Sequence, residues 1–147
     1  MDEANSILTS ARCILLVDWP SRSVPDSLAR AGFAVVVKGG PEPDHYAAYD
    51  VRGSEVVAHR TGRRPEHADV VYIHRPLAEL PGLIALAQDV GATAVWYQSG
   101  RTQGGEPDPQ GCWVDPADAA GARALVEAAG LRFVWETSIV APARPGG

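Results

Sequence analysis

The sequence is poor in cysteine and has no long apolar run. Its two cysteines, Cys13 and Cys112, form neither a disulfide framework nor a metal-ligand spacing, so we expect two reduced thiols. A transmembrane helix needs about 20 apolar residues, and no stretch of this sequence supplies them. The N-terminus, MDEANSILTSAR, begins acidic, unlike a signal peptide. These features predict a soluble, cytoplasmic protein without a membrane partner.

Positive charge is also scarce, because 13 Lys and Arg residues stand against 18 Asp and Glu residues and leave a net charge of -5. Lys38 is the only lysine. Nucleic-acid binding needs a basic stripe that contacts phosphates, so the composition argues against nucleic acid as the main partner. The four histidines show no metal-ligand spacing, and we predict no metal site.

A chain of 147 residues has the length of one domain of common size. We expect a single domain over residues 1–147, with a core at about 12–140. The last segment, APARPGG at residues 141–147, predicts a flexible tail.

A strand, a helix and a second strand are predicted between residues 69 and 100. Residues 69–73 are a short apolar, β-branched run, and Leu and Ala follow at helical spacing from Leu77 to Ala87. Gly91 ends the helix, and Ala94–Tyr97 is a second apolar run. Both strands are apolar on both faces, which is typical of a parallel sheet covered by helices on each side.

The remaining elements follow the same alternation. The Gly- and Pro-rich segment 101–113 predicts an exposed, mobile loop. Residues 41–52 predict a loop with at most one helical turn at residues 46–49. Helices are expected at Glu3–Ser10, from the N-cap Ser23 to Gly32 and from the N-cap Asp115 to Gly130, and strands at Cys13–Val17, 33–37, 55–58 and 131–135.

The predicted fold class is α/β, with a doubly wound, mainly parallel sheet of five to six strands. Numbered along the chain, the strands are expected in the order 3-2-1-4-5, with the sixth beside the fifth. In such sheets the carboxyl ends of the strands form the ligand crevice. Residues 74–76 and 98–100 follow neighbouring strands, so they should share one rim with the Asp18 loop.

Polar residues at this rim are the candidate ligand contacts. Arg75 ends the fourth strand, where its fork of donors suits a phosphate or carboxylate, or else pairs with a neighbouring acid. Gln98 and Ser99 end the fifth strand and either hold an amide, ribose or adenine edge or form a structural turn.

Lys38 ends the second strand, where dinucleotide-binding domains carry an acid that binds the ribose. A lysine there argues against NAD and suits a phosphorylated ribose, unless it is only a solvated surface residue. Trp19, after the first strand, either stacks on a base or shields the crevice. Arg22 is the nearest cation to that loop.

Residues with possible catalytic chemistry are few. His74 is either a base or a histidine satisfied by backbone, and no Ser or Cys nucleophile is patterned around it. Cys112 is either a reactive thiol on a lid or inert, because no basic partner accompanies it in sequence. We assign no catalytic residue, and enzymatic activity stays open.

Three segments, ADVVYIHRP, GATAVWYQSG and AGLRFVWETSI, together resemble a known family. They are similar to the stand-alone CoA-binding-domain proteins, Rossmann-type domains related to the CoA-binding part of succinyl-CoA synthetase. The resemblance covers about residues 12–140. It implies a Rossmann-like fold with CoA as ligand, and the 3'-phosphate of CoA would then suit Lys38.

The sequence departs from that family at two places. The family's first strand runs into a Gly-Ala-Ser loop whose amides bind pyrophosphate, but here Val17 is followed by Asp18, Trp19 and Pro20, and no glycine precedes Gly32. The closing segment has Glu-Thr-Ser at residues 136–138 in place of Asp-Arg-Cys. We expect CoA binding weaker than in relatives that keep the glycines.

The sequence thus predicts a small ligand-binding protein for CoA or a related adenosine phosphate. One alternative is a small metabolic or biosynthetic enzyme that reuses the crevice with His74, Arg75 and Cys112. Another is a scaffold that has lost its ligand and serves a protein partner. The oligomeric state stays open, a homodimer included. The predicted ligand contacts are Trp19, Arg22, Lys38, Arg75, Gln98 and Ser99.

Overall fold

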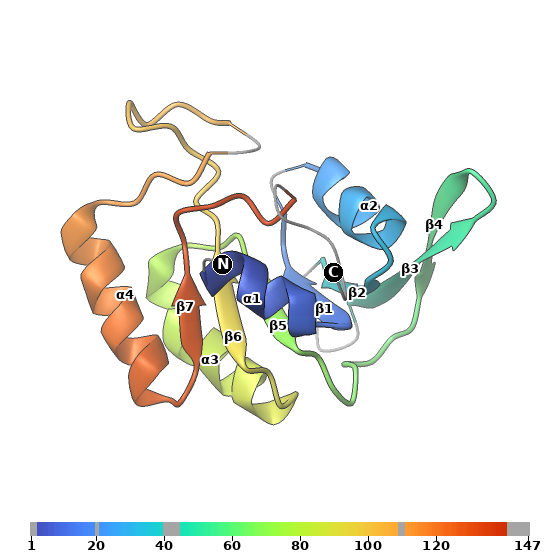
Figure 1. Ribbon diagram of the computed structural model, residues 1–147, viewed down its shortest axis with the longest axis horizontal. Coiled ribbons are helices and arrows are strands. Elements are labelled where there is room, and N and C mark those ends of the chain that lie inside the picture. The colour runs from blue at the N-terminus through green and yellow to red at the C-terminus, as the bar shows by residue number, and fades with distance from the viewer. Residues whose placement is uncertain (1–2, 20, 40–44, 109–110, 141–147) are drawn as a thin grey trace.

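A computed structural model describes residues 3–19, 21–39, 45–108 and 111–140. Its strands form one seven-stranded sheet in the order β4-β3-β2-β1-β5-β6-β7 (Figure 1). All neighbouring strands are parallel except for the pairs β2–β3 and β3–β4. The α/β class and the mainly parallel sheet are therefore confirmed. The strands are β1 (Cys13–Val17), β2 (Ala34–Lys38), β3 (Tyr46–Arg52), β4 (Glu55–Arg60), β5 (Val70–Ile73), β6 (Ala94–Tyr97) and β7 (Arg132–Val134).

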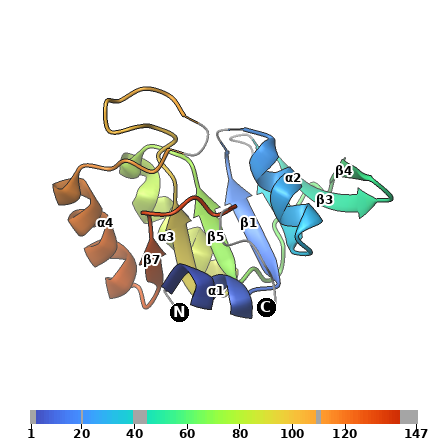
Figure 2. The same ribbon diagram turned by 45° about the horizontal axis from the view of Figure 1, so that its top comes forward.

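Helices cover both faces of the sheet, as a doubly wound fold requires (Figure 2). Ile14 and Leu16 of β1 belong to one core cluster, with residues of α1 (Glu3–Ser10) and α2 (Ser23–Arg30). Leu15 and Val17 point to the other face, into a cluster with α3 (Leu80–Asp89) and α4 (Pro116–Ala128). This alternation explains why the central parallel strands β1, β5 and β6 have no charged residue on either face.

The predicted strand–helix–strand unit is present as β5, α3 and β6. A 3-10 turn, η1 (Leu77–Glu79), precedes α3, and the helix ends one residue before Gly91 at its cap Val90. β5 and β6 pair in parallel over their whole length, from Val70 beside Ala94 to Ile73 beside Tyr97. None of the helices that the structure describes is long and apolar enough to cross a membrane.

The two predicted helix caps have different outcomes. Asp115 caps α4 as predicted, since its Oδ1 accepts a hydrogen bond of 2.9 Å from the Ala117 amide and Pro116 is the first helical residue. The N-cap at Ser23 is wrong: Ser23 is already helical, and its amide donates to the Ser21 hydroxyl at 3.2 Å. The hydroxyl that serves the first turn therefore lies two residues upstream.

The prediction of a loop at residues 41–52 is wrong for its second half. Tyr46–Arg52 is β3, antiparallel to β2, and it forms a hairpin with β4 through a turn at Gly53. This insertion also corrects the strand order, because the strand predicted at 55–58 pairs with β3 and not with the second strand. Residues 41–44, Pro20 and the predicted tail 141–147 lie outside the described residues.

Candidate functional site

The carboxyl ends of β1, β2, β5 and β6 meet at one edge of the sheet. Backbone hydrogen bonds join the segments that follow them: the Asp18 amide donates to the Lys38 carbonyl at 3.2 Å, and the His74 amide donates to the Val17 carbonyl at 3.0 Å. The Gln98 amide donates to the Ile73 carbonyl at 2.9 Å. The shared rim predicted from sequence is therefore present.

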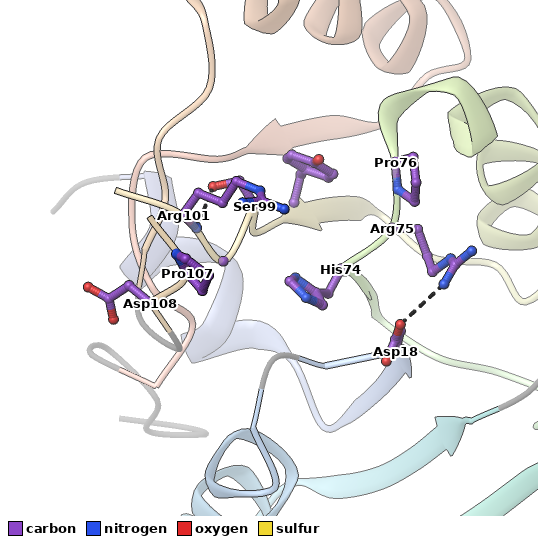
Figure 3. Close-up of a pocket in the computed structure, with 10 residues that line it drawn as sticks. Asp18, His74, Arg75, Pro76, Ser99, Arg101, Pro107 and Asp108 are labelled. Carbon is purple, nitrogen blue, oxygen red and sulfur yellow. Dashed lines mark hydrogen bonds and ion pairs between the residues drawn. The ribbon is translucent and has the colours of Figure 1, made fainter. Parts of the chain in front are cut away.

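A cavity of about 620 Å³ opens at this edge, between the ends of β1, β5 and β6 and residues 101–108 (Figure 3). Its volume is in the range of small-molecule sites. Figure 3 shows the ring of His74 pointing into the middle of the group, with Arg101 and Pro107 on one side and Arg75 on the other. The lining residues are Asp18, His74, Arg75, Pro76, Tyr97, Ser99, Gly100, Arg101, Pro107 and Asp108.

A second cavity, of about 410 Å³, lies beside the first on the β2 side. Asp18 and Arg75 line both cavities, so their side chains mark the boundary between them. Each cavity has two carboxylates and two cationic side chains along its wall, which leaves little net charge. The residues that line the second cavity are Val17, Asp18, Lys38, Gly39, Arg75, Glu79 and Leu83.

The boundary is an ion-pair network centred on Arg75. Its Nη1 donates to Asp18 Oδ2 at 3.3 Å, while Nη2 donates to Glu79 Oε2 at 2.6 Å and Nε donates to both Glu79 oxygens at 3.2 Å. The hydrogen bonds that Arg75 donates to Glu79, and secondly to Asp18, raise the pKa of its guanidinium above the usual value. The guanidinium is thus permanently charged and held by two carboxylates of the protein itself.

His74 is oriented by the strand beside it. Its Nδ1 lies 3.0 Å from the Gln98 carbonyl oxygen, and because a carbonyl only accepts hydrogen bonds, Nδ1 carries the proton. In the neutral ring Nε2 therefore keeps its lone pair. A Cβ on Gly100 would overlap the imidazole, so the ring packs directly on that glycine's backbone. The arrangement places a proton acceptor at the cavity wall.

Arg101, Pro107 and Asp108 supply one wall of the first cavity, and backbone hydrogen bonds hold the segment around them. The Gly100 amide donates to the Gly111 carbonyl at 3.0 Å, and the Trp113 amide donates to the Arg101 carbonyl at 3.1 Å. Arg101 Nη1 donates to the Gly105 carbonyl at 3.0 Å, which keeps this guanidinium along the loop. One hydrogen-bond donor of the Arg101 guanidinium is therefore already bonded within the loop.

Three of the six predicted contacts line the cavities: Lys38, Arg75 and Ser99. The Gln98 side chain does not, because it is 0% exposed and its Oε1 accepts a hydrogen bond of 2.9 Å from the buried Tyr72 hydroxyl. Gln98 thus joins two neighbouring strands below the rim.

Trp19 and Arg22 also lie outside the cavity linings. The Trp19 ring covers Gly39 at the end of β2, since a Cβ there would lie 3.2 Å from Cη2 of the indole. Arg22 is directed toward α2 and β3: its Nε lies 3.4 Å from Asp26 Oδ1, and its guanidinium carbon lies 5.5 Å from the centre of the Tyr49 ring. In this arrangement Trp19 shields the strand ends, and Arg22 has partners of its own.

The structure adds site residues that the sequence reasoning did not single out. Glu79 is four residues after Arg75, a spacing at which opposite charges pair on helices, so this partner had a sequence signal. Asp108 and Pro107 had none, because a Gly- and Pro-rich loop does not reveal where its residues lie. The sequence placed the Asp18 loop on the rim, but it did not indicate that Asp18 pairs with Arg75.

Comparison with known protein families identifies the family of this chain. The model of the CoA binding domain matches residues 16–142, which is most of the chain. The chain belongs to the CoA binding domain family. No curated protein and no solved structure matches it. The resemblance seen in the three sequence segments is thereby confirmed.

CoA is anionic, and the residues of this CoA binding domain suit it in part. Lys38 and Arg75 supply cations at the ends of β2 and β5, beside cavities of adequate size. The carboxylate of Asp18, however, lies at the position after β1 where the family has a glycine-rich loop for pyrophosphate. The cationic side chains fit a phosphorylated ligand. The carboxylates beside them, however, cancel most of the positive charge that would attract it.

Proposed function

We propose that this CoA binding domain binds CoA, or a related adenosine phosphate, across both cavities at the carboxyl edge of the sheet. The position of Arg75 carries the proposal: its guanidinium borders both cavities, with Lys38 in one and Ser99 in the other. A guanidinium with two flanking cavities suits a ligand whose charged group lies in the middle of a long molecule. CoA has its diphosphate there.

The proposal gives each end of the ligand a place. The 3'-phosphate of the adenosine lies near Lys38, the diphosphate lies near Arg75, and the pantetheine arm extends into the larger cavity past Ser99 and His74. The Trp19 ring, which packs on Gly39 beside the second cavity, is the proposed contact of the adenine. Gln98 does not contact the ligand in this arrangement, because its side chain is buried and bonded to Tyr72; it holds the ends of β5 and β6 together.

The expected affinity is micromolar or weaker. The reason is electrostatic: Arg75 already donates to Asp18 and Glu79, so the ligand's phosphates must compete with two carboxylates for the same donors. Asp18, with 44% of its side chain exposed, and Glu79, with 43% exposed, are partly hydrated, so this competition lowers the affinity without abolishing it.

Titration calorimetry with CoA tests the proposal. Arg75→Gln should weaken binding about tenfold, because one charge-assisted contact to phosphate is lost. The matched control is Arg123→Gln on α4, since Arg123 is equally exposed, at 41%, and also pairs with an acid four residues on. No heat of binding at millimolar CoA, or equal losses in both variants, would show that CoA does not bind at this site.

A small enzyme that uses His74 as a base is the second candidate, and one observation favours it. The Gln98 carbonyl fixes the Nδ1 proton, which leaves Nε2 as an acceptor at the cavity wall. Cys112 is a poor nucleophile for such an enzyme, because burial, and to a lesser extent the charge of Asp108, raises the pKa of the thiol. This candidate predicts chemical conversion of a bound ligand, visible by mass spectrometry, that is lost in His74→Gln.

A further inference from the structure

Asp18 has an unusual backbone conformation. It is the one non-glycine residue with positive φ among the described residues, at φ 62, directly after β1. Most L residues are strained in this left-handed region, although Asp and Asn tolerate it better than other side chains. The loop thus keeps a backbone shape suited to glycine while it carries a carboxylate.

The contacts of that carboxylate are those of a bound anion. Oδ1 accepts a hydrogen bond of 2.8 Å from the Trp19 amide, and Oδ2 accepts one of 3.3 Å from Arg75 Nη1. A backbone amide at a turn together with a guanidinium is a donor set that binds phosphate oxygens. Asp18 occupies this set from within the chain.

Asp18 also lies at the boundary between the cavities, since it lines both of them with Arg75. The remaining donors of the Arg75 fork, Nε and Nη2, are directed to Glu79. A phosphate that reaches Arg75 therefore finds Nη1 bonded to the Asp18 carboxylate, which faces both cavities, and the other donors bonded to Glu79.

We propose that Asp18 is an internal competitor for the ligand's phosphate and thereby determines the charge specificity of the site. Phosphorylated ligands bind only after they displace the Asp18 carboxylate from Arg75 and from the Trp19 amide. This inference rests on the proposed function for the identity of the ligand, but the competition itself applies to any diphosphate. A ligand without charge at its centre is not penalised by Asp18.

Asp18→Asn is the primary test, because Asn accepts the left-handed conformation and removes only the charge. CoA and inorganic diphosphate are the probes, measured by titration calorimetry at low ionic strength. Both should bind Asp18→Asn about tenfold more tightly than wild type, since repulsion between close charges is removed. The gain should shrink with added salt.

Two further variants separate the causes. Asp18→Gly removes the charge and also relieves the backbone, so its gain should equal or exceed that of Asp18→Asn. Asp26→Asn on α2 makes the same change in net charge away from the cavities, where Asp26 pairs with Arg22. Its affinity for both probes should stay within about twofold of wild type, because screening weakens distant charges.

The outcomes distinguish this inference from the proposed function. If no variant binds CoA but Asp18→Asn binds diphosphate more tightly than wild type, CoA is the wrong ligand and the competition by Asp18 stands. If Asp18→Asn gains affinity for neither probe, the inference is overturned even when wild type binds CoA. A gain in Asp18→Gly alone, or an equal gain in Asp26→Asn, also overturns it.

Discussion

Substitution of Gly100 by alanine should disturb the site through His74. Gly100 has φ +70, where an L residue is strained by about 1 to 2 kcal/mol. Its new Cβ would also overlap the imidazole of His74, so the ring must move and lose its 3.0 Å contact with the Gln98 carbonyl. That hydrogen bond is worth about 0.5 to 1.5 kcal/mol. We expect Gly100→Ala to lower the free energy of unfolding by about 2 to 3 kcal/mol.

Urea unfolding followed by tryptophan fluorescence measures this loss. Gly105→Ala is the matched control: Gly105 has a similar positive φ, +85, but no atom lies within 4 Å of a built Cβ. It should cost only the backbone strain. In the double variant His74→Ala/Gly100→Ala the clash disappears, so about 1 kcal/mol or more should be recovered as coupling. Equal losses for the two glycine variants, or no coupling with His74, would refute the account of the ring.

Two further predictions concern titrating groups. Burial raises the pKa of the Asp69 carboxyl, but hydrogen bonds from the Cys13 and Arg12 amides, at 3.0 and 2.8 Å, together with the contact to His67, outweigh it and hold the pKa below its usual value. Asp69→Asn should therefore cost about 1 to 2 kcal/mol at neutral pH, whereas Asp89→Asn, at a 62% exposed side chain, should cost almost nothing. The Asp69 contribution is present above its unfolded pKa of about 4 and is lost as the pH falls through the lower folded value, so in acid the urea midpoints of wild type and Asp69→Asn should converge. Because burial raises the thiol pKa of Cys112, and that of Cys13 to about 11, iodoacetamide should alkylate both thiols at pH 7 more slowly than in urea. A native rate equal to the unfolded rate would contradict this.

Much of the fold could be predicted because its elements have local signals. The strands β1, β5 and β6 are apolar on both faces, as buried parallel strands are. At the start of α4, Asp115 is the N-cap and Pro116 is the first helical residue, which are the positions these residue types prefer. These signals depend on neighbouring residues only. They indicate which helices and strands exist, and the rules for parallel sheets then give the edge where the site lies.

The β3–β4 hairpin was missed for a physical reason. β3 includes Ala47, Ala48 and Asp50, which are poor strand formers, and its partner strands supply the hydrogen bonds that hold it. A signal was available: Gly53 and Ser54 separate two runs, and Gly53 has φ +64, as a two-residue hairpin turn requires. Reading that dipeptide as a turn would have given the correct strand order.

The site could be predicted at the level of the rim but not of its contacts. Arg75 and Asp18 are 57 residues apart and pair only because β1 and β5 are neighbours. Gln98 looked like a rim residue, yet it is buried because Tyr72 of the adjacent strand offers a hydroxyl below the surface. Sequence gives the end of a strand, whereas the direction of each side chain depends on its tertiary neighbours.

Coupling between Lys38 and the 3'-phosphate of CoA tests the central claim most directly. Calorimetry with CoA and dephospho-CoA, on wild type and Lys38→Ala, forms the cycle. If Lys38 contacts that phosphate, its removal should weaken CoA by about 1.5 to 3 kcal/mol, or one to two decades, and should leave dephospho-CoA unchanged. The coupling should shrink with added salt. If Lys38→Ala weakens both ligands by the same factor, or neither, Lys38 does not bind the 3'-phosphate and the proposed placement of CoA is wrong.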